Sequence, residues 1–204
     1  MNQHLRLDPA HPARKHRYTT TNAGVDVYSP DQFKACEVRL QDMMDGISKI
    51  CRYNGQINEF YSVAEHSVLV SRYAEMMGED EMTVICALFH DGHEYLSGDL
   101  PTPHKAMVRG LAKFEEGYEL AFREALALPG PDDPVWERVA FYDSQILHRE
   151  LAVLRQENLP QWFDPNIERN VPGSLLPVGF EWREARAMFR QRMRELGWGL
   201  GGNL

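Results

Sequence analysis

Two histidines and two aspartates on three separate helical segments are the residues whose types and spacing suggest chemistry. They are His66, the adjacent pair His90 and Asp91, and Asp143. Imidazole nitrogens and carboxylate oxygens together suit a divalent transition metal such as Mn, Co, Fe, Ni or Zn better than calcium. Four protein ligands would leave positions open in an octahedral site for water and a substrate. The set therefore predicts a metal centre, provided that the helices bring the four side chains together.

His66 lies on the apolar face of a helix that the sequence predicts over residues 62–77. Ser62 and Glu65 have the spacing of a capping box, which starts a helix one turn before the histidine. At about 100° per residue, most apolar side chains of this segment fall within about 60° of His66, so the imidazole faces the core. A lone buried histidine is more often a core residue bonded to a backbone carbonyl. His66 therefore supports a metal site only in combination with the other three residues.

His90 and Asp91 lie near the end of a helix predicted over residues 80–96. The preceding run, 84–89, is apolar on all sides, as in a buried helix. Burying a titratable pair without partners would cost several kcal/mol, and a metal ion would supply the compensating charge. Small side chains on the face of His90 are expected to leave room for an approaching group; they are Thr83, Cys86 and Ala87.

Asp143 lies in the middle of the apolar stripe of a helix predicted over residues 135–157. An ionised carboxylate without a partner there would be strongly destabilising. A salt bridge to an arginine or coordination of a metal ion would relieve this cost, and this helix alone leaves both open. His148 falls about 140° away from Asp143 around the helix axis, so it is predicted to be a solvated surface residue.

The rest of the chain predicts a helical domain around these segments. Further helices are expected over residues 40–51, 103–128 and 181–196, and two short β-favouring runs, 18–21 and 25–28, predict a hairpin. The predicted fold class is all-α: a bundle of five or six helices with a small N-terminal β-hairpin, in one domain over 1–204. Its expected parts are a polar arm with the hairpin (1–35), a metal-binding helical core (36–157), a loop with the last helix (158–196) and a flexible tail (197–204).

Composition excludes several classes of function. The chain has 204 residues, 43% hydrophobic and 25% charged, which suits one globular domain. Its 22 basic and 30 acidic residues give a net charge of −8, so a surface for nucleic-acid polymers is not expected. No apolar run approaches the roughly 20 residues of a membrane span and no signal-peptide core is found, which predicts a soluble cytoplasmic protein. Three cysteines are expected to be reduced core residues: Cys36, Cys51 and Cys86.

The order of the candidate ligands resembles the H…HD…D signature of HD-domain metal-dependent phosphohydrolases. The signature falls on His66, the pair His90 and Asp91, and Asp143. The segment 90–105 is similar to the corresponding stretch of the small HD-domain nucleotidases. That subgroup includes bacterial 5′-deoxynucleotidases and phage deoxynucleoside triphosphate triphosphohydrolases. The resemblance covers roughly half of the chain, from about residue 47 to residue 143, and includes 51–53 and 61–67.

This resemblance implies roles for particular residues. The four ligands His66, His90, Asp91 and Asp143 would bind one divalent ion, with Co, Mn, Zn, Fe, Ni and Mg all compatible. Glu94 and Asp99 would position or activate the water and handle its proton. Arg52 and Lys105 would hold phosphate oxygens, and Tyr53 would stack on a base. His93 and His104 are further candidates near the site, His93 for binding the substrate.

Two positions depart from the family pattern. Relatives often have a tryptophan after the arginine and a lysine one helical turn before the final aspartate, where this chain has Tyr53 and Ala140. The missing lysine leaves the length of the substrate's phosphate chain open. The implied reaction is therefore hydrolysis of a deoxynucleotide, either of a 5′-monophosphate to nucleoside and phosphate or of a triphosphate to nucleoside and triphosphate.

Other functions remain open at the level of sequence. A cyclic-nucleotide or alarmone phosphodiesterase would use the same ligands and differ in its products. A non-catalytic nucleotide-binding HD module would have no reason to retain Glu94 and Asp99. An oxygenase with two irons would require more ligands than the sequence offers. The resemblance also suggests a homo-oligomer whose partner is a small-molecule nucleotide, and neither a nucleic-acid polymer nor a membrane.

Overall fold

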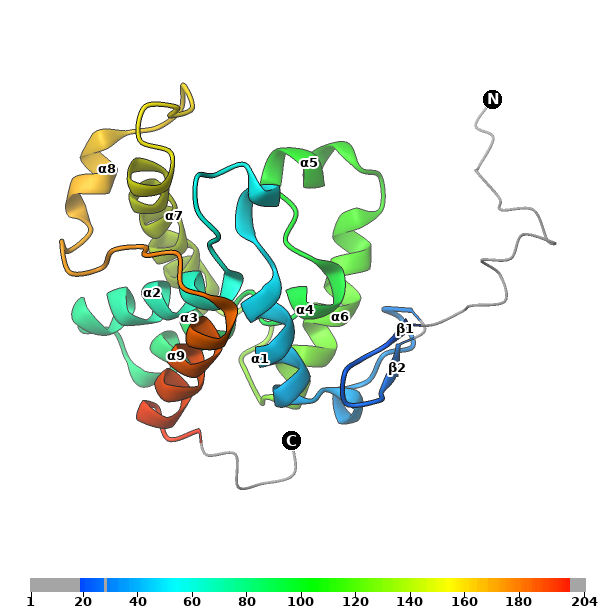
Figure 1. Cartoon of the computed structure of the whole chain (residues 1–204). Helices are drawn as coiled ribbons and strands as arrows, with labels where there is room; N and C mark the ends of the chain where they lie inside the picture. The colour runs from blue at the N-terminus through cyan, green and yellow to red at the C-terminus, as the bar shows by residue number, and fades with distance from the viewer. Residues whose placement is uncertain (1–18, 28, 199–204) are drawn as a thin grey trace, which may run out of the picture.

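The computed structural model describes residues 19–27 and 29–198, most of which are helical (Figure 1). The strands are β1 (Thr19–Thr20) and β2 (Asp26–Val27), and the 3₁₀ turns are η2 (Ala35–Glu37) and η3 (Arg52–Gly55). The helices are α1 (Leu40–Lys49), α2 (Val63–Met76), α3 (Glu81–Phe89), α4 (Glu94–Ser97), α5 (Thr102–Met107), α6 (Leu111–Ala125), α7 (Val135–Leu154), α8 (Pro165–Asn170) and α9 (Trp182–Glu195). A mostly helical fold with a small hairpin near the N-terminus is thus confirmed.

The hairpin forms where the sequence predicts it. β1 and β2 pair antiparallel, and the amide of Thr21 donates to the carbonyl of Val25 at 2.8 Å across the turn. The predicted runs also include Tyr18 and Tyr28, which lie outside the described residues. Residues 1–17 lie outside them as well.

Two helices that the sequence predicts as continuous are each divided in two. α3 ends at Phe89, and the chain turns through residues 90–93 before α4 begins. α5 and α6 are separated near Gly110, which has a left-handed φ of 84°. Apolar periodicity extends across both breaks and therefore gave no signal for them. The first break places His90 and Asp91 in the turn between α3 and α4 rather than within a helix.

α8 was missed because its segment reads as a proline-containing loop. The Asp164 side chain accepts a hydrogen bond from the amide of Asn166 at 2.8 Å, and Pro165 occupies the first helical turn. An aspartate N-cap followed by proline favours a helix start. The proline that suggested irregular chain therefore begins a helix.

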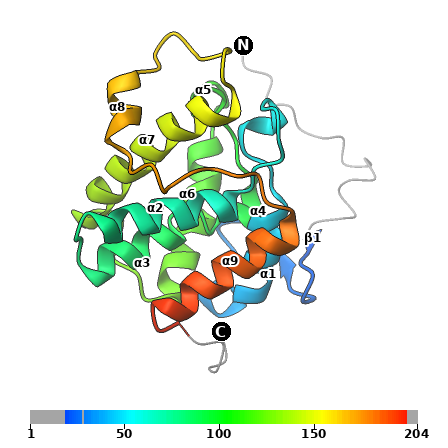
Figure 2. The ribbon, with the colours of Figure 1, turned by 60° about the vertical axis from the view of Figure 1, so that its left-hand side comes forward.

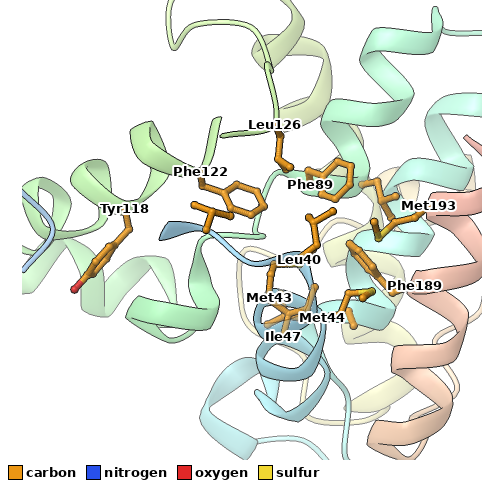
Figure 3. Packing of buried hydrophobic residues seen from close by; sticks show 14 of the residues in the cluster. Leu40, Met43, Met44, Ile47, Phe89, Tyr118, Phe122, Leu126, Phe189 and Met193 are labelled. Atoms are coloured by element: carbon orange, nitrogen blue, oxygen red, sulfur yellow. The ribbon is translucent and has the colours of Figure 1, made fainter. Parts of the chain in front are cut away.

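One hydrophobic core fixes the end of α3. Figure 3 shows labelled side chains of α1, α6 and α9 gathered around Phe89. The Phe89 ring centroid lies 5.9 Å from that of Phe189 and 6.3 Å from that of Phe122. All three rings are buried. Because His90 follows Phe89 directly, this packing determines where the candidate ligand pair leaves the helix.

A second core joins α2, α3 and α7, the helices on or beside which the candidate ligands lie (Figure 2). Thr83, Cys86 and Ala87 are fully buried, and Arg138 of α7 donates to the Thr83 hydroxyl at 2.8 Å. The room that these small side chains leave on the face of His90 is thus occupied by α7. They allow α7 to pack closely on α3, and this packing brings Asp143 towards α2.

The Glu65 carboxylate ties the C-terminal segment to the start of α2. The Ser62 hydroxyl accepts a hydrogen bond from the Glu65 amide at 3.1 Å, as the capping box predicts. The Glu65 side chain, which is 1% exposed, instead accepts the amides of Val178, Gly179 and Phe180 at 2.6, 3.2 and 3.0 Å. Only half of the predicted capping box therefore forms, and the glutamate anchors the chain that leads into α9.

Replacing Glu65 with alanine is expected to lower the free energy of unfolding by about 3 kcal/mol, because three buried amides would lose a charged acceptor. Urea denaturation followed by circular dichroism measures this change. Glu116→Ala, at an exposed position of α6, provides the control and is expected to change stability by less than about 0.5 kcal/mol. Equal stabilities of the two variants would show that Glu65 is not an anchor.

The cysteines differ in their surroundings. All three are free; Cys86 is buried, Cys51 is half-buried and Cys36 is exposed. The predicted core position is thus confirmed for Cys86 and wrong for Cys36, which lies on the short turn η2 rather than on a core-facing helix.

Part of the predicted flexible tail is packed. The Trp198 ring lies 5.1 Å from the ring of Phe89, centroid to centroid. Residues 199–204 lie outside the described part of the chain. Across residues 19–27 and 29–198, no helix combines the length and the apolar character needed to cross a membrane.

Candidate metal centre

The four predicted ligands meet between α2, the end of α3 and α7. His66 Nε2 lies 3.0 Å from Asp143 Oδ1 and 3.3 Å from His90 Nε2. Asp91 Oδ2 lies 3.1 Å from His90 Nε2 and 3.7 Å from His66 Nε2. Metal–ligand bonds of about 2.1 Å separate neighbouring ligands of one ion by roughly 3 Å. His66, His90 and Asp91 therefore form a group that could hold a metal ion, since their ligand atoms all lie within 4.8 Å of one another, and Asp143 adjoins this group through His66.

Both imidazoles direct the same nitrogen to this centre. His66 Nδ1 lies 2.5 Å from Glu150 Oε1, and His90 Nδ1 lies 2.8 Å from the carbonyl oxygen of Ala87. Protons on the two Nδ1 atoms would be donated to these acceptors and would leave both Nε2 lone pairs facing the centre. Metal-binding histidines are oriented in this way. A core histidine bonded to a carbonyl would not explain why the second nitrogen of His66 faces Asp143.

The electrostatics of the centre favour a positive charge. Burial and the nearby Arg52 lower the pKa of His66, but the carboxylates of Glu150 and Asp143 outweigh them and raise it to about 9. Asp143 pairs with His66 rather than with an arginine, so the salt-bridge interpretation of this aspartate does not apply. The same field would stabilise a divalent cation, and the donor set fits one.

Glu150 contacts both the candidate ligand His66 and the pocket residues Arg52 and Tyr53, and the sequence pattern did not predict this role. Its carboxylate is fully buried and lies in contact with His66. It also accepts hydrogen bonds from the hydroxyls of Tyr53 and Tyr61 at 2.5 and 2.7 Å. Arg52 Nε lies 3.5 Å from the same carboxylate. Burial alone would raise the pKa of Glu150, but the charges of His66 and Arg52 lower it to about 2. An ionised Glu150 therefore orients both a metal ligand and an arginine.

Replacing Glu150 with glutamine is expected to weaken metal binding by about 10-fold to 100-fold, because the amide keeps the shape but loses the charge that orients His66. Titration of the metal-free protein with Mn²⁺ or Co²⁺ in a calorimeter measures the affinity. Glu157→Gln, at an exposed position beyond α7, is the matched control. An unchanged affinity in the Glu150 variant would remove this residue from the metal site.

A left-handed turn presents Arg52 and Tyr53 to the centre. Tyr53 and Asn54 have φ values of 59° and 51°, a conformation that costs energy for residues other than glycine and persists where contacts enforce it. The hydrogen bond of the Tyr53 hydroxyl to Glu150 is such a contact. Arg52 Nη1 lies 3.3 Å from Asp91 Oδ2, so the guanidinium adjoins the predicted metal ligands.

A pocket of about 800 Å³ opens beside this centre. Asp91 and Asp143 line it, and the Asp143 side chain is 39% exposed because it faces this space rather than the apolar core. The other predicted site residues in its wall are Arg52, Tyr53, Glu94, Asp99, His104 and Lys105. Two of the four residues that the resemblance implies for the metal thus share one pocket with those that it implies for water and phosphate, whereas His66 and His90 are not part of its wall.

Two buried glutamates hold Lys105 at the pocket. Lys105 Nζ lies 3.5 Å from Glu94 Oε1 and 3.1 Å from Glu115 Oε1. The other oxygen of Glu94 is buried and has no hydrogen-bond partner among the described residues. Burial and the charges of Asp91 and Asp99 raise the pKa of Glu94 well above its usual range, and Lys105 partly opposes them. A carboxyl group with a free oxygen and a raised pKa is typical of a general acid or base.

The remaining candidates occupy different positions. Asp99 lines the pocket, where burial raises its pKa and Arg52 opposes that rise. His104 lines the pocket from an exposed position on α5. His93 is 7% exposed and is not part of the pocket wall, and burial lowers its pKa. The structure therefore does not bring His93 into contact with the space where a substrate would lie.

The prediction that His148 is a solvated surface residue is wrong. It is 6% exposed, and its Nδ1 lies 2.8 Å from the carbonyl oxygen of Ser144. The rings of Trp162 and Phe163 pack on it at centroid distances of 5.7 and 5.6 Å. Its position on α7 faces away from the main core, but the segment after α7 folds back and covers it.

Comparison with known proteins gives relatives without an assigned function. No protein-family model matches the chain. The chain is similar to the uncharacterized protein YfdR of Escherichia coli strain K12, with 32% identity over 99 residues, which are 48% of this chain and 53% of that protein. It is also similar to an uncharacterized protein of Rhodobacter capsulatus, with 28% identity over 168 residues, which are 76% of this chain and 84% of that protein. The chain thus spans about half the length of the E. coli relative and most of the other.

Proposed function

We propose that this protein is an HD-domain phosphohydrolase that cleaves a phosphate ester or anhydride bond of a deoxynucleotide. The observation that carries the proposal is the pocket of about 800 Å³, whose wall combines two candidate metal ligands with three cationic side chains and two further carboxylates. Phosphoryl transfer requires charge neutralisation on the phosphate oxygens and an oriented nucleophile. The H…HD…D order of the ligands supports the same family.

Each of the pocket side chains has a distinct task in this proposal. A bound divalent ion would neutralise phosphate charge and lower the pKa of the attacking water. Arg52 would donate to phosphate oxygens through its planar guanidinium, and Lys105 would add a compact charge. Glu94 would orient the water and accept its proton, and Asp99 would assist in moving that proton.

The ion pairs of the pocket support a mechanism in which Lys105 exchanges its contact with Glu94 for one with the substrate phosphate. Lys105 contacts Glu94 and Glu115, and Arg52 contacts Asp91. Phosphate oxygens would compete for Lys105 and weaken its contact with Glu94, which is the longer of the two. Glu94 would then be free to interact with water while Glu115 keeps Lys105 in place.

Arg52→Gln is expected to lower kcat/KM by about 10²-fold for every nucleotide that the protein hydrolyses, because a phosphate contact is common to all of them. Steady-state kinetics with each active nucleotide measure this ratio. Arg169→Gln, at an exposed position of α8, is the control. A change in base preference without a general loss would contradict a phosphate-binding role for Arg52.

The proposed activity is tested by incubating the purified protein, with Mn²⁺, Co²⁺ or Mg²⁺, with deoxynucleoside mono-, di- and triphosphates. Cyclic nucleotides and guanosine tetraphosphate are included, and products are separated by anion-exchange chromatography. Inorganic phosphate from monophosphates, or triphosphate from deoxynucleoside triphosphates, is the expected product. Cleavage of only the cyclic or alarmone substrates would replace the proposal with a phosphodiesterase. Nucleotide binding without any product would indicate a non-catalytic module.

A further inference from the structure

Arg155 differs from the other basic side chains of the pocket. Arg52 and Lys105 are both paired with carboxylates. Arg155, which follows α7, also lines the pocket, but no described residue forms an ion pair with it, and its Nε is buried without a hydrogen-bond partner there. Its guanidinium carbon lies 5.7 Å from the centroid of the Tyr53 ring. An unpaired guanidinium beside an aromatic ring points to a ligand that provides acceptors.

Trp162 is a second aromatic side chain in the wall of the same pocket. Its side chain is 58% exposed, so much of the indole surface is accessible. His148 of α7 contacts it edge-to-face, at 5.7 Å between centroids and 81° between ring planes. The indole is therefore held by its edge contact with α7 while much of its surface remains accessible to a ligand.

The surroundings of Arg155 favour a planar ring over additional phosphates. The wall of the same pocket also contains the apolar side chains of Leu147, Leu151 and Pro160, besides the rings of Tyr53 and Trp162. A phosphate chain carries several charges and requires several cations or metal ions, whereas a planar heterocycle can stack on aromatic and guanidinium groups. Arg155 could donate to a carbonyl or ring nitrogen at the edge of such a heterocycle.

We propose that Tyr53, Arg155 and Trp162 form a subsite for the nucleobase of the substrate and thereby determine base preference. This inference rests on the proposed function, because it assumes that the phosphate lies beside Asp91 and Asp143. The Tyr53 ring lies within 6 Å of the guanidinium carbons of both Arg52 and Arg155. The pentose of a nucleotide would then lie between the phosphate at Arg52 and the base at Arg155.

The test measures binding separately from turnover, with the full chain in the presence of Mg²⁺. Isothermal titration calorimetry measures the binding of the four deoxynucleoside 5′-monophosphates, of 2-deoxyribose 5-phosphate and of inorganic tripolyphosphate, and quenching of tryptophan fluorescence is recorded with the same compounds. The variants are Arg155→Met and Trp162→Leu, and the matched controls are Arg169→Met and Trp182→Leu on α8 and α9. Hydrolysis of the same compounds is measured in parallel.

Nucleotides are expected to quench the fluorescence, and 2-deoxyribose 5-phosphate is not. Trp162→Leu should abolish the quenching, and Arg155→Met should weaken nucleotide binding about tenfold or more while leaving 2-deoxyribose 5-phosphate unaffected. Equal weakening of nucleotides and 2-deoxyribose 5-phosphate by Arg155→Met, or tight binding of tripolyphosphate that depends on Arg155, would overturn the base subsite and make Arg155 a phosphate contact. Unchanged binding in both variants would also overturn it.

The outcomes separate this inference from the proposed function. If nucleotides bind through Trp162 and Arg155 but are not hydrolysed, the base subsite stands and the hydrolase proposal fails. If nucleotides are hydrolysed at the same kcat/KM as 2-deoxyribose 5-phosphate, and neither variant alters that ratio, the hydrolase proposal stands and the base subsite fails.

Discussion

Asp143→Asn is expected to abolish metal binding and to lower turnover by about 10³-fold or more, since a bound ion contributes several kcal/mol to phosphoryl transfer. The asparagine keeps the size of the side chain but removes the negative charge that lies 3.0 Å from His66 Nε2. The side chain faces the pocket, so the fold is expected to survive the change. Elemental analysis after dialysis gives the metal content, and circular dichroism verifies the fold.

Asp132→Asn provides the control for this experiment, because Asp132 is an exposed aspartate in the loop before α7. It is expected to bind metal and turn over substrate like the unaltered protein. One metal ion per chain in the Asp143 variant would show that this aspartate is not a ligand.

Glu94→Gln is expected to retain the metal and to bind nucleotide while turnover falls by roughly 10²-fold to 10⁴-fold, the contribution of a positioned acid or base. Glu94 is 2% exposed, and one of its oxygens has no partner among the described residues. The glutamine fills the same space but cannot accept a proton from water. Single-turnover kinetics together with metal analysis separate this chemical step from binding.

Glu124→Gln, at an exposed position of α6, is the matched control for Glu94, and Asp99→Asn is measured beside it. Loss of the metal from the Glu94 variant would make Glu94 a ligand rather than a base. Near-full turnover in that variant, with a large loss in the Asp99 variant, would transfer the proton-accepting role to Asp99.

The sequence predicts the candidate metal centre because its residues interrupt the apolar pattern of buried helices. His66 and Asp143 each interrupt an apolar face, and burial of a charge requires a partner. Glu150 follows the same rule: it lies two helical turns after Asp143 and therefore shares a face of α7 with it. The spacing of these two acids was a signal that the sequence contained and that went unused.

The position of Trp162 in the pocket wall had no comparable signal. Trp162 reaches it only because the segment after α7 folds back over His148, and no periodic pattern describes such a loop. The break after Phe89 was equally hidden, since the apolar run gives no indication that α3 ends before His90. Packing between distant segments decides both features. Propensity and periodicity describe each segment alone and cannot anticipate this packing.

The ion itself provides the most direct test of the central claim. Crystals grown with Mn²⁺ or Co²⁺ would be measured on both sides of the metal absorption edge to obtain an anomalous difference map. One peak is expected within about 2.0–2.3 Å of His66 Nε2, His90 Nε2 and a carboxylate oxygen each of Asp91 and Asp143. A map with no peak there, or with a peak bound by other residues, would contradict the metal centre on which the proposed hydrolase depends.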